Sequence, residues 1–313
     1  MVSLTVFTFA GFLLGLLFGS FLNVCISRLP AHESVVRPRS RCPRCGAQIR
    51  WYDNIPVLSW ILLGGLCRDC GEPISVRYPL VELAVGAWFA IQASRLHMLL
   101  AAFQAPNSTI TTSEAAMNAI TLLAVVVMGF LLIGLMVMDW QTHLLPDTFT
   151  VIGIVIGLLF VCAQAVFLGP TQDQILLAKQ SIRIGTMGGA ADTGNVFLTG
   201  PEALIGGRIL AIGAAALLLL GVRWFYLAAR RREGMGLGDV KLFAMIAAFL
   251  GFWPAILALF VGVFTASVYG IALLAARRAN AASKLPFGSF LAAGALFADL
   301  FGDRIIEAYR SLL

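Results

Sequence analysis

The sequence predicts an all-α polytopic membrane protein with about eight transmembrane helices and a small four-cysteine, metal-binding insert on the cytoplasmic side. Of the 313 residues, 59% are hydrophobic and only 12% are charged, whereas soluble domains average about 25% charged residues. Apolar runs of about twenty residues recur along the chain, which is the length that a hydrocarbon core about 30 Å thick requires. These observations exclude an ordinary soluble enzyme.

Eight apolar runs are candidate spans, and the sixth is short. No basic residue precedes the first run and Arg28 follows it, the reverse of a cleavable signal peptide, so we predict a retained helix. The predicted parts are a first transmembrane helix (1–27), a cytoplasmic insert (28–77) and a transmembrane helical domain (78–313) with an outer loop at 169–203. The runs are 4–24, 79–94, 116–138, 149–168, 204–222, 240–252, 255–276 and 285–301.

The basic residues gather in short clusters between the apolar runs. A net charge of +6 could indicate a nucleic-acid partner, but clusters in this position are typical of topology determinants, so we expect no nucleic acid to bind. Residues 28–77 hold eight arginines against four acidic residues, and further clusters lie at 223–241 and 277–284. The excess of positive charge predicts that these segments are cytoplasmic. Counting the spans alternately then leaves both termini outside.

Four cysteines in the insert have the spacing of a metal site. Cys42 and Cys45 form one C-x2-C pair, and Cys67 and Cys70 form a second pair after 21 intervening residues. Two such pairs deliver four thiolates to one tetrahedral ion, and a glycine follows each pair. Disulfides are disfavoured in a reducing cytoplasm. We therefore predict a structural metal, expected to be zinc with iron left open, which holds an insert too short to bury its own core.

Two carboxylates stand at the ends of apolar runs. Asp139 closes the third run, and Asp239 opens the sixth after Gly236 and Gly238. By the topology above both lie at the cytoplasmic face. Two carboxylates brought close together share a proton, so that one activates water while the other polarises an amide carbonyl. The glycines allow close approach of a substrate strand or a positive φ. The run lacks the Gly-Lys-Ser/Thr ending of a phosphate-binding loop.

Other interpretations of these carboxylates stay open on composition alone. Asp139 and Asp239 are also suited to capping helices or pairing with basic neighbours, and for Asp147 a helix cap is as good an explanation as a functional role. A second class of function is a transporter or membrane scaffold whose interfacial carboxylates bind ions or protons. Inverted repeats would favour a transporter, and none is evident in the sequence.

Several motifs occur in a fixed order along the chain. The first half contains Phe18-Gly19-Ser20-Phe21-Leu22-Asn23-Val24, Cys42-Pro43-Arg44-Cys45-Gly46 and Arg77-Tyr78-Pro79. The second half contains the Asp139 to Asp147 segment with Leu145-Pro146-Asp147, then Gly236-Leu237-Gly238-Asp239 and Leu285-Pro286-Phe287-Gly288. Over nearly its whole length the chain resembles the bacterial type IV prepilin peptidases, which are membrane aspartic proteases that also N-methylate their product. Presenilin-type proteases share the Gly-x-Gly-Asp element, but not the four-cysteine insert or the Leu-Pro-Asp segment.

The resemblance implies an activity and a set of site residues. Asp139 and Asp239 would be the catalytic pair, with Asp147, Gly236 and Gly238 in supporting roles. The substrates would be type IV prepilins and pseudopilins, whose basic leader is removed at the cytoplasmic face of the bacterial inner membrane. S-adenosylmethionine would then methylate the new N-terminus. No motif places the binding site of this methyl donor, and we expect residues 18–82 and the cytoplasmic loops to contribute to it.

Two features depart from the pattern of the resemblance. Ser289 follows Pro286-Phe287-Gly288 at a position where the family usually has proline, which makes the turn less rigid. The outer loop at 169–203 is longer than expected and lies on the side of the membrane opposite the presumed site. We therefore expect this loop to be dispensable for cleavage.

Overall fold

The computed structural model describes residues 3–31, 33–167, 201–231, 235–276 and 285–310. Within these residues the protein is built from helices, with two isolated β-bridges in the insert and no longer strand. The predicted outer loop at 169–203 lies outside the described residues except for its last three, which begin a helix. The prediction that this loop is dispensable therefore stays a prediction.

Eight long helices match the eight predicted apolar runs. They are α1 (Leu4–Arg28), α3 (Arg77–Phe103), α4 (Thr112–Thr142), α5 (Asp147–Val166), α7 (Pro201–Arg230), α8 (Leu237–Leu250), α9 (Phe252–Ala275) and α10 (Phe287–Arg310). Of the helices in the described residues, α1, α3, α4, α5, α7 and α9 are long and apolar enough to cross a membrane. The predicted fold class is confirmed, and the chain is a multi-pass membrane protein.

Three helices, α3, α7 and α10, extend well past the apolar runs that predicted them. α3 continues to Phe103 rather than ending near residue 94, and Arg95 on this extension bonds Asp299 of α10 at 2.9 Å. α7 runs to Arg230, so Arg223 and Arg230 lie on a helix and not in the predicted loop. Hydropathy marks only the part of a helix that lipid covers, whereas arginine, leucine and alanine favour further helix beyond it.

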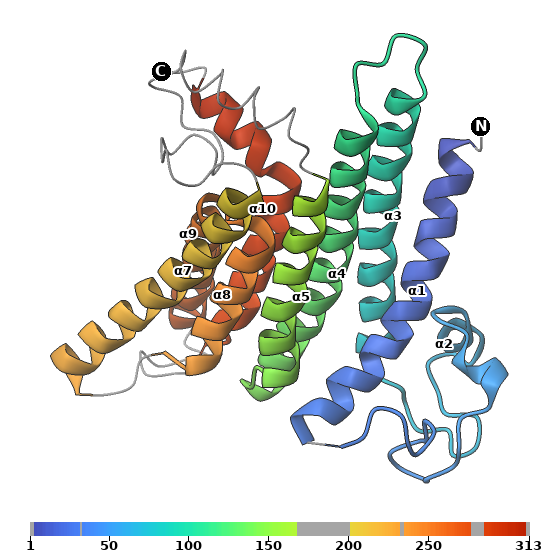
Figure 1. Ribbon diagram of the computed structural model, residues 1–313. Coiled ribbons are helices and arrows are strands. Elements are labelled where there is room, and N and C mark those ends of the chain that lie inside the picture. Colours follow the sequence, from blue (N-terminus) through green and yellow to red (C-terminus); the bar gives the residue numbers. More distant parts are fainter. Residues whose placement is uncertain (1–2, 32, 168–200, 232–234, 277–284, 311–313) are drawn as a thin grey trace, which may run out of the picture.

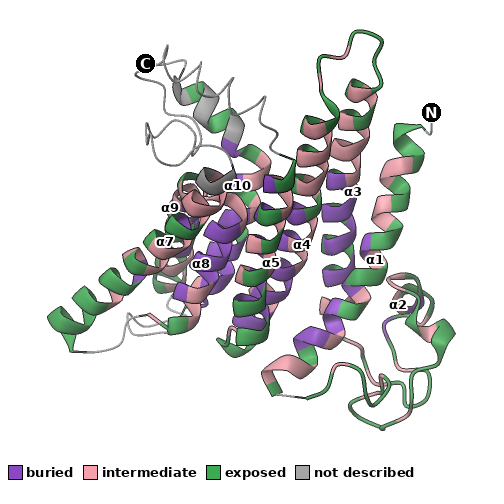
Figure 2. Cartoon of the chain, viewed as in Figure 1, coloured by how far each residue is buried: buried purple, intermediate pink, exposed green. Residues whose placement is uncertain are grey.

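The helices form a layered bundle in which α8 is the most enclosed element. Residues 242–248 of α8 are all buried, as Figure 2 shows by the purple of this helix. The guanidinium of Arg208 on α7 donates to the carbonyl of Phe249 at 2.8 Å and thereby satisfies the end of α8. A helix of only 14 residues thus depends on its neighbours, α4, α5, α7, α9 and α10, for burial.

Close packing of α1 on α3 joins the insert to the rest of the bundle. At Gly15 of α1 an added Cβ would lie 2.7 Å from the Cα of Gly86, and at Gly19 one would lie 2.6 Å from the Cα of Glu82. No side chain fits at these distances, so the two backbones touch here. The insert between these helices contains the 3-10 turns Leu29–Ala31 and Trp51–Asn54 and the short helix α2 (Leu58–Leu62).

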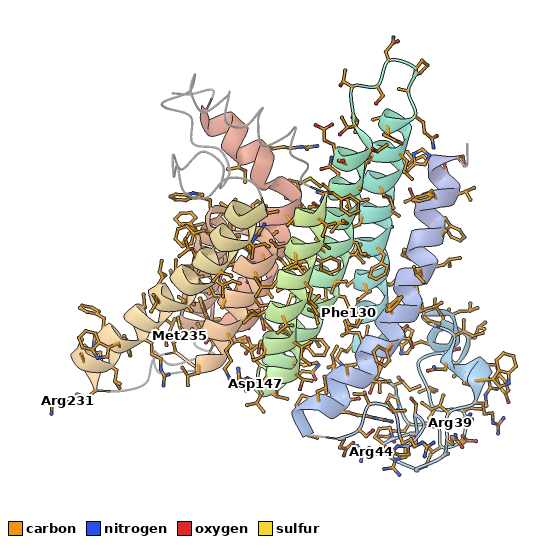
Figure 3. The ribbon with its side chains drawn as sticks, viewed as in Figure 1. Arg39, Arg44, Phe130, Asp147, Arg231 and Met235 are labelled. Atoms are coloured by element: carbon orange, nitrogen blue, oxygen red, sulfur yellow. The ribbon has the colours of Figure 1, made fainter. Side chains whose placement is uncertain are left out.

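The chain brings its functional segments to one end of the bundle. In Figure 1 the insert, the turn from α4 to α5 and the start of α8 all lie at the lower end. Figure 3 places Asp147, Met235 and Arg44 in this same half of the molecule. Segments that are far apart in the sequence therefore share one face, as the charge pattern predicts.

Candidate active site

The two predicted catalytic aspartates face each other from separate helices. Asp139 lies in the last turn of α4 and is only 5% exposed. Asp239 lies in the first turn of α8, partly buried, and accepts a hydrogen bond from the backbone N–H of Gly236. Helices α4 and α8 are in contact, and the two carboxylates are close enough for each to influence the ionisation of the other. The structure thus brings together two carboxylates that are 100 positions apart in sequence.

A third residue, Ser289, contacts Asp139 directly. Its backbone N–H donates to Asp139 Oδ2 at 2.7 Å, and its Oγ lies 2.9 Å from the same carboxylate oxygen. The same Oγ lies 2.9 Å from the carbonyl oxygen of Met136 on α4. Sequence reasoning considered only the backbone at this position and missed the side chain. A polar residue in an otherwise apolar first turn of α10 was the available signal.

Glycines let three helix ends meet around Leu145. An added Cβ at Gly238 would lie 3.1 Å from the Leu145 side chain, and one at Gly288 would lie 2.9 Å from it. The Cβ at Gly288 would also lie 3.2 Å from the Asp139 carboxylate. The expected positive φ before Asp239 is wrong, because Gly236 has φ −74° and Gly238 is not among the positive-φ residues. Close approach of the Leu145 side chain to the backbone is the reason for Gly238 and Gly288.

The supporting residue Asp147 lies near the pair but is exposed. It stands at the start of α5, and its Oδ1 accepts a hydrogen bond from Lys241 Nζ at 2.6 Å. Lys241 is two residues after Asp239, so this ion pair joins the start of α5 to the first turn of α8. Asp147 is therefore placed to fix the position of α8, the helix that carries Asp239. It does not contact a substrate path that the structure defines.

The cysteines of the insert converge on one point. The Sγ atoms of Cys42, Cys45, Cys67 and Cys70 all lie within 4.8 Å of one another, and those of Cys42 and Cys70 are 3.9 Å apart. A tetrahedral zinc ion with Zn–S bonds of about 2.3 Å separates its sulfurs by about 3.8 Å. All six cysteines of the chain are described, and none is in a disulfide. The arrangement fits a four-thiolate metal site.

Two equivalent turns build this cluster. Cys42 N–H bonds Ala47 O at 2.9 Å, and Cys67 N–H bonds Glu72 O at 2.8 Å. Gly46 and Gly71 have φ of +74° and +69°, as expected for the residue that closes each turn. Each pair of cysteines is therefore presented by the same backbone conformation, which is typical of zinc knuckles.

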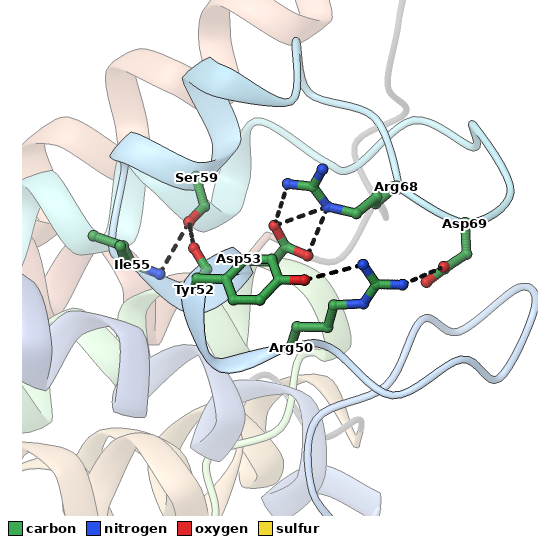
Figure 4. Close-up of polar contacts among 7 residues, drawn as sticks. All are labelled: Arg50, Tyr52, Asp53, Ile55, Ser59, Arg68 and Asp69. Atoms are coloured by element: carbon green, nitrogen blue, oxygen red, sulfur yellow. Dashed lines mark hydrogen bonds and ion pairs between the residues drawn. The ribbon is translucent and has the colours of Figure 1, made fainter.

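Ion pairs tie the second knuckle to the rest of the insert (Figure 4). Arg68 bonds both carboxylate oxygens of Asp53 at 2.6 to 3.1 Å, and Arg50 joins Tyr52 to Asp69. The hydrogen bonds from Arg68 hold the pKa of Asp53 below its usual range. Asp53 is therefore ionised at neutral pH and engaged within the insert.

A cavity of about 990 Å³ lies between the insert and helices α1 and α3. Glu82 on α3 lines it and accepts a hydrogen bond from the Val57 N–H at 2.7 Å. Asn23 on α1 is 3% exposed and lines the same cavity; its amide donates to Tyr78 O at 3.0 Å, while its Oδ1 has no protein partner. An unpaired buried acceptor is costly, so it marks a place where a ligand donor fits.

The cavity is linked to the end of α4 that carries Asp139. Arg77, another lining residue, donates from Nη1 to the side chain of Gln141, two residues after Asp139. A smaller pocket beside the cavity is lined by Ser27, Arg77, Gln141 and Leu144 among others. The insert and the cavity thus reach the last turn of α4.

Comparison with known proteins shows two matching regions. Residues 13–96 match the bacterial peptidase A24 N-terminal domain, and residues 125–271 match the type IV leader peptidase family. The first region holds the insert and the cavity, and the second holds Asp139 and Asp239. No solved structure matches this chain.

Curated relatives from several bacteria carry the name prepilin leader peptidase/N-methyltransferase. The protein of Myxococcus xanthus is 36% identical over 86% of this chain, an alignment that covers 64% of the relative. That of Pseudomonas aeruginosa is 31% identical over 97% of this chain and 93% of the relative. That of Burkholderia pseudomallei is 32% identical over 92% of this chain and 84% of the relative.

Proposed function

The chain belongs to the type IV leader peptidase family, and from this premise we propose a membrane aspartic endopeptidase that also N-methylates its product. It removes the basic leader from type IV prepilins and pseudopilins, and it then transfers a methyl group from S-adenosylmethionine to the new N-terminal residue. The paired burial of Asp139 and Asp239 at the meeting point of α4, α8 and α10 is the observation that carries the peptidase proposal.

The chemistry follows from the shared proton of the pair. One carboxylate takes a proton from water as the water oxygen attacks the scissile carbonyl, and the other donates its proton to the carbonyl oxygen. Collapse of the tetrahedral intermediate breaks the C–N bond, and the leaving amine receives the proton that the base took up. Asp147, Gly236 and Gly238 keep supporting roles, in which the ion pair with Lys241 and the packing on Leu145 hold the first turn of α8.

We place the carboxylate pair at the cytoplasmic face of the bacterial inner membrane. The basic insert and the start of α8 lie at the same end of the bundle, and an excess of arginine favours the cytoplasmic side. The apolar helix of a prepilin then lies in the bilayer beside α4 and α8, while its basic leader stays in the cytoplasm. The bilayer and the prepilins are thus both partners of the enzyme.

The test of the peptidase proposal is a mass measurement. The detergent-purified protein is incubated with a prepilin precursor and S-adenosylmethionine, and the precursor mass is followed over time. Loss of the leader mass followed by the gain of one methyl group supports both activities. Absence of cleavage by the folded wild-type protein overturns the proposal, and ion or proton transport becomes the function to measure.

The methyl donor is proposed to bind in the cavity between the insert, α1 and α3. S-adenosylmethionine carries an ammonium group, a sulfonium charge and ribose hydroxyl groups, and it supplies the methyl group when bound. The unpaired Oδ1 of Asn23 and the carboxylate of Glu82 are acceptors suited to these groups. The contact between Arg77 and Gln141 joins a residue that lines the cavity to the last turn of α4, the turn that also carries Asp139.

Replacing Glu82 with Gln is expected to reduce methylation at least about tenfold while cleavage stays within about twofold. The amide oxygen of Gln still accepts the Val57 N–H, so the insert stays anchored, but the attraction for a cationic donor is lost. The mass assay reads both steps in one experiment. Glu114→Gln, in the capping box of α4, is the matched control. Equal loss of cleavage and methylation in Glu82→Gln contradicts a separate methyl-donor site.

The four-cysteine cluster is proposed to hold a structural zinc ion. Cys70→Ser is expected to abolish the bound metal and to expose residues 28–76 to limited proteolysis, because a serine hydroxyl is a poor zinc ligand. Metal mass spectrometry of the purified protein measures the first effect. Cys162→Ser removes an exposed thiol of α5 and is the matched control. Full metal content in Cys70→Ser, or iron in the wild type, contradicts the zinc proposal.

A further inference from the structure

Three polar contacts around Ser289 and Asp139 limit where protons can be. Ser289 N lies 2.7 Å from Asp139 Oδ2, and Ser289 Oγ lies 2.9 Å from both Asp139 Oδ2 and Met136 O. Each distance is that of a hydrogen bond, and each such bond needs one proton between its two atoms. Both residues are almost fully buried, at 4% and 5% exposed, so bulk water does not supply the protons.

The number of protons depends on the charge of Asp139. If Asp139 is ionised, the backbone N–H and the single hydroxyl proton of Ser289 must serve all three contacts. Either two oxygen atoms with lone pairs would then face each other at 2.9 Å, or the hydroxyl proton would be shared between Asp139 Oδ2 and Met136 O in a weaker three-centre bond. If Asp139 carries a proton on Oδ2, that proton bonds Oγ, the hydroxyl proton bonds Met136 O, and every contact is satisfied. A neutral Asp139 is therefore the state that fits the geometry.

We propose that Ser289 is a positioning residue that holds the shared proton of the aspartate pair on Asp139 and leaves Asp239 as the base. The inference rests on the proposed peptidase function and assigns the two roles that this function leaves open. Asp239 then takes the proton from water, and Asp139 protonates the carbonyl oxygen of the scissile bond. The amine leaves with the proton held by Asp239, and Asp139 regains its proton from the collapsing hydroxyl group.

The charged neighbours of Asp139 are compatible with this assignment. His143, which ends α4, is exposed and one turn away; a positive charge on it would favour the ionised form of Asp139, and its exposure to solvent screens that effect. Asp239 on α8 disfavours a second negative charge nearby. Of the charged groups near this end in the described part of the chain, Lys241 of α8 pairs with Asp147 of α5, and Arg77 of α3 donates to Gln141.

The pH dependence of cleavage tests the assignment, because only the singly protonated pair is active. In Ser289→Ala the proton on Asp139 loses its hydrogen-bond acceptor. This loss destabilises the doubly protonated and the singly protonated forms of the aspartate pair equally. The acid limb of the kcat/KM profile therefore stays in place, and the alkaline limb moves to lower pH by about half a unit to one unit, the effect of one neutral hydrogen bond. Ser289→Thr keeps the hydroxyl and is expected to restore the wild-type profile.

Other outcomes overturn the inference. If the acid limb moves to higher pH and the alkaline limb stays, Ser289 donates to an ionised Asp139. Asp139 is then the base and Asp239 the acid. If neither limb moves, Ser289 only packs. Thr150→Val is the matched control, since it removes another fully buried hydroxyl, one that donates to Pro146 O at 3.4 Å. A wild-type protein that cleaves no precursor contradicts the proposed function itself, which is distinct from any of these profiles.

Discussion

Replacing Asp139 or Asp239 with Asn is expected to abolish leader removal, while the protein stays folded and inserted in the membrane. Each substitution leaves the shape of the side chain nearly unchanged but removes the proton that the pair must share. Without the base, water is not activated, and without the acid, the carbonyl is not polarised. We expect kcat/KM to fall by at least about 10³-fold, which corresponds to ~4 kcal/mol of lost transition-state stabilisation.

The measurement is leader loss from a prepilin precursor by mass, with both single variants and the double variant. Because the two carboxylates act as one unit, the double variant is expected to be no worse than either single one. Asp69→Asn, in an exposed pair with Arg50, is the control and should cleave normally. Normal cleavage by folded Asp139→Asn and Asp239→Asn would refute the aspartic mechanism and return attention to ion binding.

Much of the fold could be predicted because lipid imposes a simple rule on sequence. A span needs an apolar run of fixed length, and the eight runs match the eight long helices. The ends of α3 and α7 could not be predicted by this rule, since arginines on a helix extend past the lipid without an apolar signal. The cysteine cluster was predictable for a similar reason, because four ligands within 29 residues fix their own geometry.

The catalytic pair and Ser289 differ in what the sequence reveals. Asp139 and Asp239 are conspicuous because a carboxylate at the end of an apolar run demands an explanation. Ser289 is not conspicuous, since a serine in a helix has many uses and its distance from Asp139 is 150 positions in the chain. Its role depends on the register in which α10 packs against α4. That register is set by contacts such as Gly288 on Leu145, which no spacing in the sequence expresses.

Gly288 provides the second large expected effect. In Gly288→Ala the new Cβ would lie 3.2 Å from the Asp139 carboxylate and 2.9 Å from the end of the Leu145 side chain. Leu145 is flexible enough to move, but the carboxylate is held by two contacts from Ser289 and must shift with the helix. A displacement of about 1 Å at a reacting group costs about 10²-fold in rate, so we expect that loss in kcat with little change in KM.

A control for helix propensity is needed, since alanine favours helix over glycine. Gly213→Ala, on α7, adds the same methyl group where no atom lies within 4 Å, and it should retain full activity or gain slight stability. Thermal unfolding in detergent measured beside cleavage separates a misplaced carboxylate from a misfolded bundle. If Gly288→Ala cleaves as fast as Gly213→Ala, the contact between α10 and Asp139 does not position the acid. The packing of α10 would then serve stability alone, and the assignment of the proton to Asp139 would lose its structural basis.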